Sequence, residues 1–325
     1  MKILVTGSAG YIGSVVCELL IEQGHSVVGL DNFGNGHQQA SIPGTMTYNA
    51  NVNDEEQLDS IFTNHEPEAV IHLAAKSLVG ESVTNPSKYY GANVVESLAL
   101  LQKMTEYGVT KIVFSSSAAV YGEPEKTPIT EKQAPNPINP YGETKRAFEE
   151  ILKWYEHAYG LRYIALRYFN AAGATSLFGE HHTPETHLIP IILDVALQQD
   201  RPMKIFGDDY ETPDGTCIRD YVHVIDIANA HIDALRSLEK KPSGIYNIGN
   251  GIGFSNREIY ETAKQITGQN IPLQITPRRD GDPAILVASN DKAGNDLGWN
   301  AKHSELAEII QSAWDWKKKF PHGYE

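Results

Sequence analysis

The sequence predicts an α/β protein: a doubly wound parallel sheet with a smaller C-terminal lobe of mixed α/β structure. Three observations support this fold class. Short apolar runs alternate with helical stretches over the first half of the chain, a glycine-rich turn follows the first run, and the pattern loosens after Asn170. Strands separated by helices pair in parallel, because right-handed crossovers return the chain to the same edge. We expect one domain at residues 1–170, with later elements interleaved, and the lobe at 171–325.

The first strand and its turn are the most specific part of this pattern. An apolar run at residues 3–5 is followed by Gly7, Gly10 and Gly13 and then by a helix predicted over 14–23. The first glycine allows a tight turn, the second lets the backbone approach a pyrophosphate, and the third lets the helix pack closely on the strand. The helix N-terminus would face phosphates with free N–H groups. This arrangement is typical of a Rossmann-type dinucleotide site.

The second strand, residues 26–30, ends at Asp31. A carboxylate at this point can accept hydrogen bonds from the hydroxyls of an adenosine ribose. It would repel a 2′-phosphate, and no Lys or Arg adjoins Asp31 in the sequence. The pattern therefore favours NAD as the cofactor of the first domain.

The alternation continues as far as residue 170. We expect helices at 54–63, 86–107 and 141–159, and strands at 69–73, 111–114 and 163–166. Ligands of parallel sheets bind beyond the carboxyl ends of the strands. The segments that follow the strands are therefore candidate site residues, namely 73–77, 115–117 and 167–170.

Past residue 170 the chain is less regular. A loop rich in Gly, Thr and His is expected at 171–186, with later turns at 207–209 and 213–215. Ser255 and Glu258 have the spacing of a capping box, and the helix that they open should end at Gly268. These shorter elements are those of the smaller lobe.

The composition excludes a nucleic-acid-binding role. The chain has 27 Lys and Arg against 41 Asp and Glu, a net charge of −14, and no long basic run. Lys317, Lys318 and Lys319 form the longest such run near the C-terminus, and we interpret them as a solvated helix end. An acidic protein must bind an anionic ligand with isolated local cations, so single arginines near turns become candidates for phosphate contacts.

Cysteine usage and hydropathy favour a cytoplasmic soluble protein. Cys17 and Cys217 lie far apart and match no zinc spacing, which fits a reducing compartment. No stretch approaches ~18 consecutive apolar residues, and we see no signal peptide.

Ser117, Tyr141 and Lys145 are the candidate catalytic residues. Tyr141 and Lys145 are four apart, so on a helix they share a face. An ammonium close to the phenol favours the phenolate, which can act as a general base near neutral pH. Ser117 follows a predicted strand and would hydrogen-bond the same substrate oxygen. The expected chemistry is proton removal from a sugar-type hydroxyl as hydride moves to NAD, with Lys145 on the nicotinamide ribose.

The histidines of the 171–186 loop and its end also raise the question of a metal. His181 and His182 are adjacent, so their side chains point in different directions on most backbones. The spacing of His187 from the other histidines and from the carboxylates also matches no recognised metal site. We therefore expect no metal.

Several segments carry a family resemblance over essentially the whole chain. TGSAGYIGS, DNFGNG, HLAAKSLVGES, FSSSAAVYG, PYGETK, RYFNAAGA, FGDDYETPDGTCIRDYVHV, RRDGDP and LGW resemble the extended short-chain dehydrogenase/reductases. RYFNAAGA and DGTCIRDYVHV are more particular to the nucleotide-sugar 4-epimerases within them. The resemblance implies an NAD-dependent isomerase that interconverts UDP-galactose and UDP-glucose through a 4-keto intermediate. It also implies a homodimer, paired through the helices at 87–107 and 141–159.

The resemblance, together with the motifs above, assigns residues to two ligands. The NAD site would comprise Gly7, Gly10, Tyr11, Ile12, Gly13, Asp31, Asn32, Phe33, Gly34, Asn35, Gly36, Asn51, Val52, Leu73, Ala74, Ala75, Asn93, Ser115, Tyr141, Lys145 and Phe169. The UDP-sugar site would comprise Ser117, Tyr141, Asn170, His187, Leu188, Ile205, Phe206, Arg219, Arg279, Asp282 and Leu286. The two arginines would clamp the diphosphate, for which bidentate guanidinium groups are suited. Surface ion pairs with the adjoining Asp220 and Asp280 are the alternative.

This chain departs from the family pattern at three positions. Asn51 stands where many members have an aspartate, and Lys76 lies one place before an expected lysine, with Ser77 at that place. Leu286 occupies a position that limits the sugar pocket, so use of the N-acetylated sugars is left open.

Two alternative functions remain, each belonging to a different class of protein. A nucleotide-sugar 4,6-dehydratase, or another sugar-modifying member of this superfamily, would share the scaffold. Dehydration needs an acidic pair directly after the catalytic serine, and Ala118 and Ala119 stand there. A non-catalytic NAD-sensing protein would commonly lack the tyrosine or the lysine.

Overall fold

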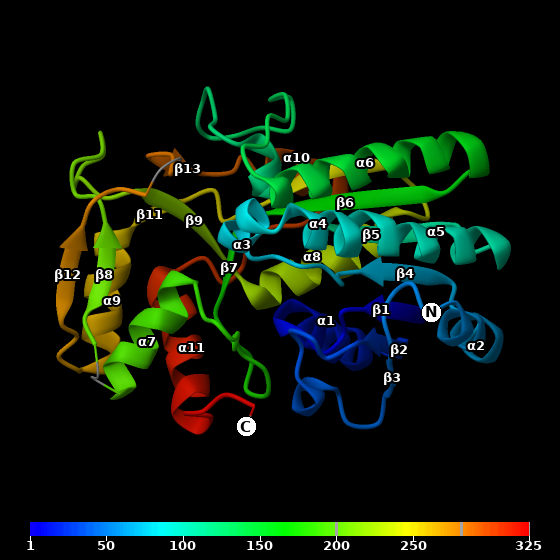
Figure 1. Ribbon diagram of the computed structural model, residues 1–325, viewed down its shortest axis with the longest axis horizontal. Helices are drawn as coiled ribbons and strands as arrows, with labels where there is room; N and C mark the ends of the chain where they lie inside the picture. The colour runs from blue at the N-terminus through cyan, green and yellow to red at the C-terminus, as the bar shows by residue number, and fades with distance from the viewer. Residues whose placement is uncertain (199–200, 280–281, 325) are drawn as a thin grey trace.

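The large sheet confirms the predicted fold class. The computed structural model describes residues 1–325 except 199–200, 280–281 and 325, and in the described part a seven-stranded parallel sheet runs in the order β10-β6-β5-β4-β1-β2-β3 (Figure 1). The strands are β1 (Lys2–Thr6), β2 (Ser26–Asp31), β3 (Met46–Asn49), β4 (Ala69–His72), β5 (Lys111–Ser117), β6 (Arg162–Tyr168) and β10 (Gly244–Ile248). The strand order reverses at β1, which pairs with both β2 and β4. Ligands of such sheets bind at this reversal.

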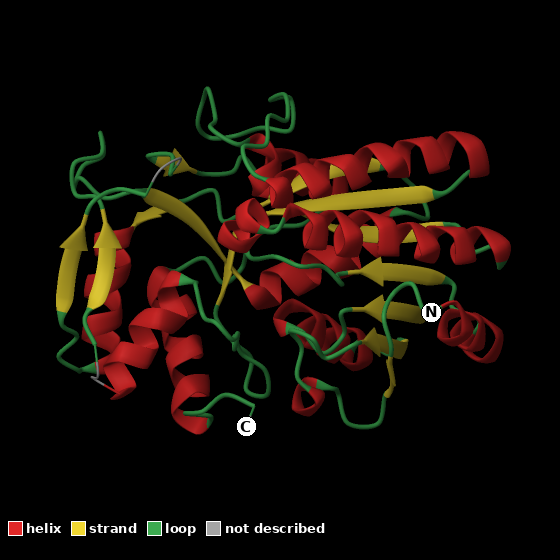
Figure 2. Ribbon diagram, viewed as in Figure 1, coloured by secondary structure: helices red, strands yellow, loops and turns green. Residues whose placement is uncertain are grey.

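Helices cover both faces of the large sheet (Figure 2). Strand side chains alternate between the faces, so Ile3 and Val5 join one apolar cluster while Leu4 joins the other. The first cluster is closed by α1 (Tyr11–Glu22), α8 (Val224–Ser237) and α10 (Asp291–Leu297). The second is closed by α2 (Glu55–His65), α5 (Glu96–Glu106) and α6 (Pro140–Tyr159).

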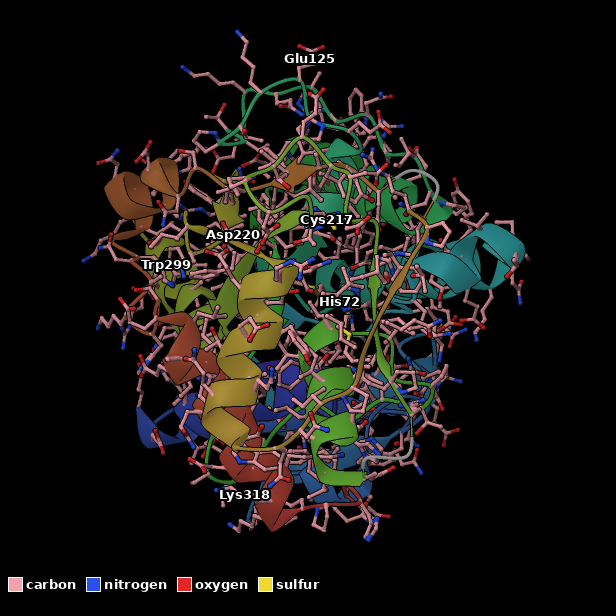
Figure 3. The ribbon with its side chains drawn as sticks, turned by 90° about the vertical axis from the view of Figure 1, so that its left-hand side faces the viewer. His72, Glu125, Cys217, Asp220, Trp299 and Lys318 are labelled. Carbon is pink, nitrogen blue, oxygen red and sulfur yellow. The ribbon has the colours of Figure 1, made fainter. Side chains whose placement is uncertain are left out.

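The smaller lobe contains the remaining elements. A mixed sheet combines β7 (Asn170–Ala172), β9 (Ile218–His223), β11 (Gly253–Ser255) and β13 (Ile285–Leu286), and β8 (Met203–Phe206) pairs with β12 (Leu273–Thr276). A third apolar cluster packs against α7 (Leu188–Gln198), α9 (Asn256–Thr267) and α11 (Leu306–Lys319). Figure 3 views the molecule from this side and shows α7 and α9 next to each other. The domain division at residue 170 remains a prediction.

The local signals of helix ends are confirmed in the lobe. The Ser255 hydroxyl accepts from the Glu258 backbone N–H, and the Glu258 carboxylate accepts from the Ser255 N–H. Gly268 follows the helix in a left-handed conformation, with φ +65°. Among the described residues, no helix combines the length and the apolar character that crossing a membrane requires.

Three details differ from the sequence predictions. The half-exposed edge strand β3 was not predicted, because its residues lack a clear apolar alternation. The helix predicted over 86–107 consists of α4 (Pro86–Tyr90), a π-helical segment (Gly91–Val95) and α5. Lys317 is not solvated as expected, since its ammonium lies 2.6 Å from Asp194 of α7 and its side chain is mostly buried. Side-chain partners from distant segments cannot be seen in a run of three lysines.

Candidate active site

The glycine turn after β1 has the form that the sequence predicted. Gly7 has a φ of +72°, and a Cβ on Gly13 would lie 1.9 Å from the Gly7 carbonyl oxygen, so α1 can pack this closely only with glycine there. Gly10 is the N-cap of α1, and within the described chain no side chain caps this end. The free N–H groups and the positive end of the helix dipole form a cradle for an anionic group such as a diphosphate.

Asp31 is fixed at the end of β2 by its backbone contacts. Its carboxylate accepts hydrogen bonds from the N–H groups of Ala9 (2.9 Å) and Phe33 (2.8 Å). Burial raises the pKa of Asp31, and these two hydrogen bonds and the charge of Lys76 act in the opposite direction. The structure thus brings a lysine near Asp31 that the sequence places far away, and the Lys76 ammonium donates to Asn35 at 3.2 Å.

The three candidate catalytic residues come together where β5 ends and α6 begins. The Asn139 side chain caps α6 by accepting from the Gly142 N–H at 2.9 Å. Gly142 lets this first turn approach the segment after Ser117, because a Cβ there would lie 2.4 Å from the Ala119 carbonyl oxygen. Ser117 lies close enough to Tyr141 to lower the pKa of its phenol, and both side chains line the same cavity. Strand end and helix start therefore meet as the sequence predicted.

Lys145 lies one turn further along α6 and is almost fully buried. Its ammonium donates to the Ser115 carbonyl oxygen at 2.8 Å and lies 5.9 Å from the centre of the Tyr141 ring. Burial lowers the pKa of Lys145 to about 7, against the opposing effect of Glu149. Burial also raises the pKa of Tyr141, although the neighbouring Ser117 side chain opposes this shift. The pKa of Tyr141 therefore shifts in the direction opposite to our expectation. In the protein alone, the desolvation of the phenol outweighs the effect of the distant ammonium.

The two arginines lie at the other end of the site, in the lobe. Arg219 on β9 is largely buried, and its Nη2 has no hydrogen-bond partner among the described residues, although Asp282 lies 3.5 Å away. Arg279 is half-exposed, pairs with Asp282 at 2.7 Å and lies over the Phe206 ring at 4.9 Å. An unsatisfied buried guanidinium nitrogen is costly, and a phosphate oxygen would satisfy it.

Arg219 does not form the alternative ion pair with its sequence neighbour, Asp220. Asp220 is fully buried on the opposite face of β9 and accepts from three backbone N–H groups, those of Asn250, Gly251 and Ala288. Asp280, the neighbour of Arg279, lies outside the described residues.

One cavity connects the two parts of the molecule and has a volume of about 1760 Å³. This exceeds the ~300–1,000 Å³ of a pocket for one drug-sized ligand, so a dinucleotide and a second ligand fit together. Most of the predicted site residues line it, namely Gly7, Gly10, Tyr11, Ile12, Gly13, Asp31, Asn32, Asn35, Gly36, Asn51, Val52, Leu73, Ala74, Ala75, Ser115, Ser117, Tyr141, Lys145, Phe169, Asn170, His187, Leu188, Phe206, Arg219, Arg279, Asp282 and Leu286. Lys76 and Ser77 both line it as well.

Four predicted residues lie outside the wall of this cavity. Ile205 is buried in the apolar cluster of the lobe, because strand alternation points it away from Phe206. Asn93 lies behind the wall in the π-helical segment, where its amide bonds both backbone groups of Lys76. Phe33 and Gly34 belong to the turn that presents Asp31 and Asn32.

The structure also adds residues that the sequence did not suggest. Glu180, His182 and Glu185 line the cavity beside His187, and the four side chains form one cluster. The spacing had given no reason to expect this, because an irregular loop brings the residues together rather than a helix or hairpin.

These features are typical of one class: enzymes with a dinucleotide cofactor, a Ser, Tyr and Lys beside it, and room for a second ligand that carries phosphate. The chain belongs to the NAD dependent epimerase/dehydratase family, whose model matches residues 3–249.

Particular members are similar along the whole chain. The UDP-glucose 4-epimerase of Halalkalibacterium halodurans is 54% identical, over 100% of this chain and 98% of that protein. A crystal structure of UDP-glucose 4-epimerase matches with a TM-score of 0.98 at 49% identity and covers 100% of both chains. The UDP-glucose 4-epimerase of Bifidobacterium longum, crystallised in complex with NAD+ and UDP, matches with a TM-score of 0.94 at 36% identity, over 99% of this chain and 100% of that one.

Proposed function

We propose that this protein is an isomerase that interconverts UDP-galactose and UDP-glucose by NAD-dependent epimerisation at C4 of the hexose. The observation that carries the proposal is the arrangement of one cavity: Ser117, Tyr141 and Lys145 lie beside the glycine turn, and Arg219 and Arg279 lie in the lobe. The full-length similarity to UDP-glucose 4-epimerases supports the same conclusion. NAD is the cofactor, and when bound it would supply the hydride acceptor and donor for C4.

Each catalytic residue has a distinct role in this reaction. Tyr141 accepts the proton of the sugar 4-hydroxyl and later gives it back. Ser117 hydrogen-bonds the same oxygen and positions it. Lys145 binds the nicotinamide ribose in its protonated form. Since burial alone raises the pKa of Tyr141, the positive charges of Lys145 and of the oxidised cofactor are what favour the phenolate.

Inversion requires the 4-keto sugar to turn over between the two hydride transfers. The arginines hold the diphosphate, as charge-assisted bidentate hydrogen bonds suit it. The walls near the reacting end include Phe169, Asn170 and Leu286, which offer fewer charges. A ligand held at its phosphates and loosely at its sugar can rotate while the diphosphate stays in place.

The two alternatives lack the side chains that they need. Ala118 and Ala119 line the cavity directly after Ser117, where a dehydratase needs an acid and a base. The complete Ser–Tyr–Lys group argues against a protein that only senses NAD. Incubation of the purified protein with UDP-galactose, followed by separation of the products, tests the proposal. UDP-glucose should form to a constant equilibrium ratio from either direction, and absence of UDP-glucose at any protein concentration would refute it.

Leu286 determines which sugars fit. It is half-buried and packs with Phe169 against a small apolar cluster at the cavity wall. A leucine leaves more room than a tyrosine, so we infer that UDP-N-acetylgalactosamine is also a substrate. Leu286→Tyr should lower kcat/KM for the N-acetylated sugar at least about tenfold and change that for UDP-galactose much less. Leu286→Met is the control of similar volume. Equal losses for both sugars would contradict the inference.

We infer that the enzyme is a homodimer paired through α4, the π-helical segment, α5 and α6. These helices lie together on one side of the sheet (Figure 1). They expose large apolar side chains, with Val95 64% and Trp154 68% exposed, and Tyr90, Tyr107 and Tyr159 nearby in the sequence. Exposed apolar side chains on neighbouring helices are the kind of surface that another copy of the chain can cover.

The pairing predicts the effect of a charge on this surface. Val95→Asp combined with Trp154→Arg should convert a dimer to a monomer, measured by size-exclusion chromatography with light scattering. Ile275→Asp, at an apolar residue of the lobe that is 39% exposed, is the control and should stay dimeric. A wild-type protein that is monomeric at micromolar concentration would refute the pairing.

We further infer a cytoplasmic location. Cys17 and Cys217 are unpaired and buried. Burial raises the pKa of the Cys17 thiol to about 12, so this cysteine is unreactive. Unpaired cysteines and a resident dinucleotide both fit a reducing compartment.

A further inference from the structure

Three side chains of the loop between β7 and α7, those of Glu180, His182 and Glu185, have no role in the reaction above, and they form a cluster with His187 of the predicted UDP-sugar site. Glu180, His182, Glu185 and His187 each offer one potential ligand atom, and these atoms all lie within 4.8 Å of one another. The contacts are short: His187 Nδ1 lies 2.7 Å from Glu180 and 3.3 Å from Glu185, and His182 Nδ1 lies 3.4 Å and 3.5 Å from the same two carboxylates.

These distances are close to those between the ligand atoms of a first coordination shell. A tetrahedral ion with metal–nitrogen and metal–oxygen bonds of about 2.0–2.2 Å keeps its ligand atoms roughly 3.3–3.5 Å apart. Both His182 contacts already have this separation, to Glu180 Oε1 and Glu185 Oε2. The His187–Glu180 contact of 2.7 Å must widen, and the other pairs, which lie within 4.8 Å, must settle into the same range. Two imidazole nitrogens with two carboxylate oxygens suit zinc and its neighbours in the first transition series. Magnesium and calcium prefer oxygen ligands alone.

The side chains are held in place by their surroundings. His182 Nδ1 is buried and makes no hydrogen bond to any described residue, while its ring packs edge-on against Tyr11. Glu185 Oε1 accepts from the backbone N–H groups of Thr186 (2.8 Å) and His187 (2.9 Å). These bonds fix the carboxylate while Oε2 faces His182. Supporting contacts of this kind orient the ligands of metal sites.

The cluster can also be reached from outside the nucleotide cavity. A second cavity of about 220 Å³ lies on its other side, lined by Glu180, His182 and Glu185. Asp194, Gln198 and His322 form other parts of its wall. An ion can therefore enter without passing through the site of the nucleotide and the sugar.

We propose that Glu180, His182, Glu185 and His187 bind one divalent transition-metal ion of the zinc type. The ion ties together the two arms of the loop that precedes α7. That loop ends at His187, which lies next to Leu188 of α7, and both residues line the nucleotide cavity. The bound metal thus stabilises one side of the substrate site, and it takes no part in the chemistry at C4. Without the ion, the same four side chains form ion pairs.

Equilibrium dialysis of the tag-free, NAD-bound enzyme tests the proposal. The protein is first treated with a chelator and then dialysed against micromolar zinc chloride. We expect one zinc ion per chain by atomic emission and a higher unfolding temperature. Glu185→Gln and His182→Gln should each weaken zinc binding at least about tenfold. His181→Gln is the matched control, because the ring of this neighbouring histidine stacks on His37, outside the cluster.

Cobalt supplies a readout that needs no variant. Co²⁺ bound to two nitrogens and two oxygens in tetrahedral geometry absorbs visible light much more strongly than octahedral Co²⁺, and zinc should abolish this absorption. Weak octahedral absorption, no zinc retained by the wild type, or equal zinc loss in His181→Gln and Glu185→Gln would each overturn the proposal. The four residues would then be an ion-paired cluster only.

Discussion

Replacing Tyr141 by phenylalanine should lower kcat for UDP-galactose by about 10²–10⁴-fold, while NAD stays bound. The phenol oxygen is the group that accepts the 4-hydroxyl proton, and it alone is removed. The ring that packs beside Lys145 and the rest of the cofactor wall remain. Turnover is measured from UDP-glucose formed per active site, and retained NAD from the cofactor released on denaturation.

Tyr121→Phe is the matched control for this substitution. Tyr121 is a fully buried tyrosine near the site, and its hydroxyl donates to Asn247 and not toward the cavity. This variant should lose some stability, since Asn247 loses a partner, and keep kcat within a few-fold of wild type. A Tyr141→Phe enzyme that also kept kcat within tenfold would refute the role of Tyr141 as the base.

The parts of the site that the sequence could predict are those set by local rules. The glycine turn needs only close packing and a positive φ, both of which act within a few residues. Asp31 follows from the end of a strand, and Tyr141 with Lys145 from one helical turn. The prediction of Ser117 also used the fact that the carboxyl ends of parallel strands lie at the same edge of the sheet. The resemblance supplied the positions in the lobe.

The parts that could not be predicted depend on contacts between distant segments. Lys76 reaches Asn35 near Asp31, and nothing in either stretch of sequence indicates it. Ile205 and Phe206 are adjacent, and only the structure shows that one of them faces the core and the other the cavity. The pKa of Tyr141 depends on burial, which a helical spacing does not report.

A second group of buried charges lies on the face of α6 that carries the catalytic residues. Glu149 is four residues beyond Lys145, and its carboxylate accepts from Arg167 of β6 at 2.9 Å and 2.5 Å and from Ser116 of β5 at 2.6 Å. Glu149 is 1% exposed and Arg167 3%. The pair therefore joins the catalytic helix to two strands of the sheet inside the core.

Glu149→Ala should lower the free energy of unfolding by about 3–5 kcal/mol, because the Arg167 charge is left buried without a partner. Urea unfolding of the NAD-bound protein measures this loss of unfolding free energy. Glu150→Ala, one position further on α6, removes a partner of Lys153 from an exposed ion pair and should cost at most about 1 kcal/mol. Equal losses for the two variants would show that the buried pair contributes nothing beyond a surface ion pair.

The isosteric variant Glu149→Gln separates the stability of this group from its effect on catalysis. Burial lowers the pKa of Lys145 to about 7, and the Glu149 charge is what opposes that shift. Removing the charge must lower the pKa of Lys145 further, so the ammonium is lost at a lower pH. If protonated Lys145 is the active form, the alkaline limb of the kcat profile moves toward acid in Glu149→Gln. An unchanged limb would mean that the bound cofactor, rather than Glu149, sets the charge of Lys145.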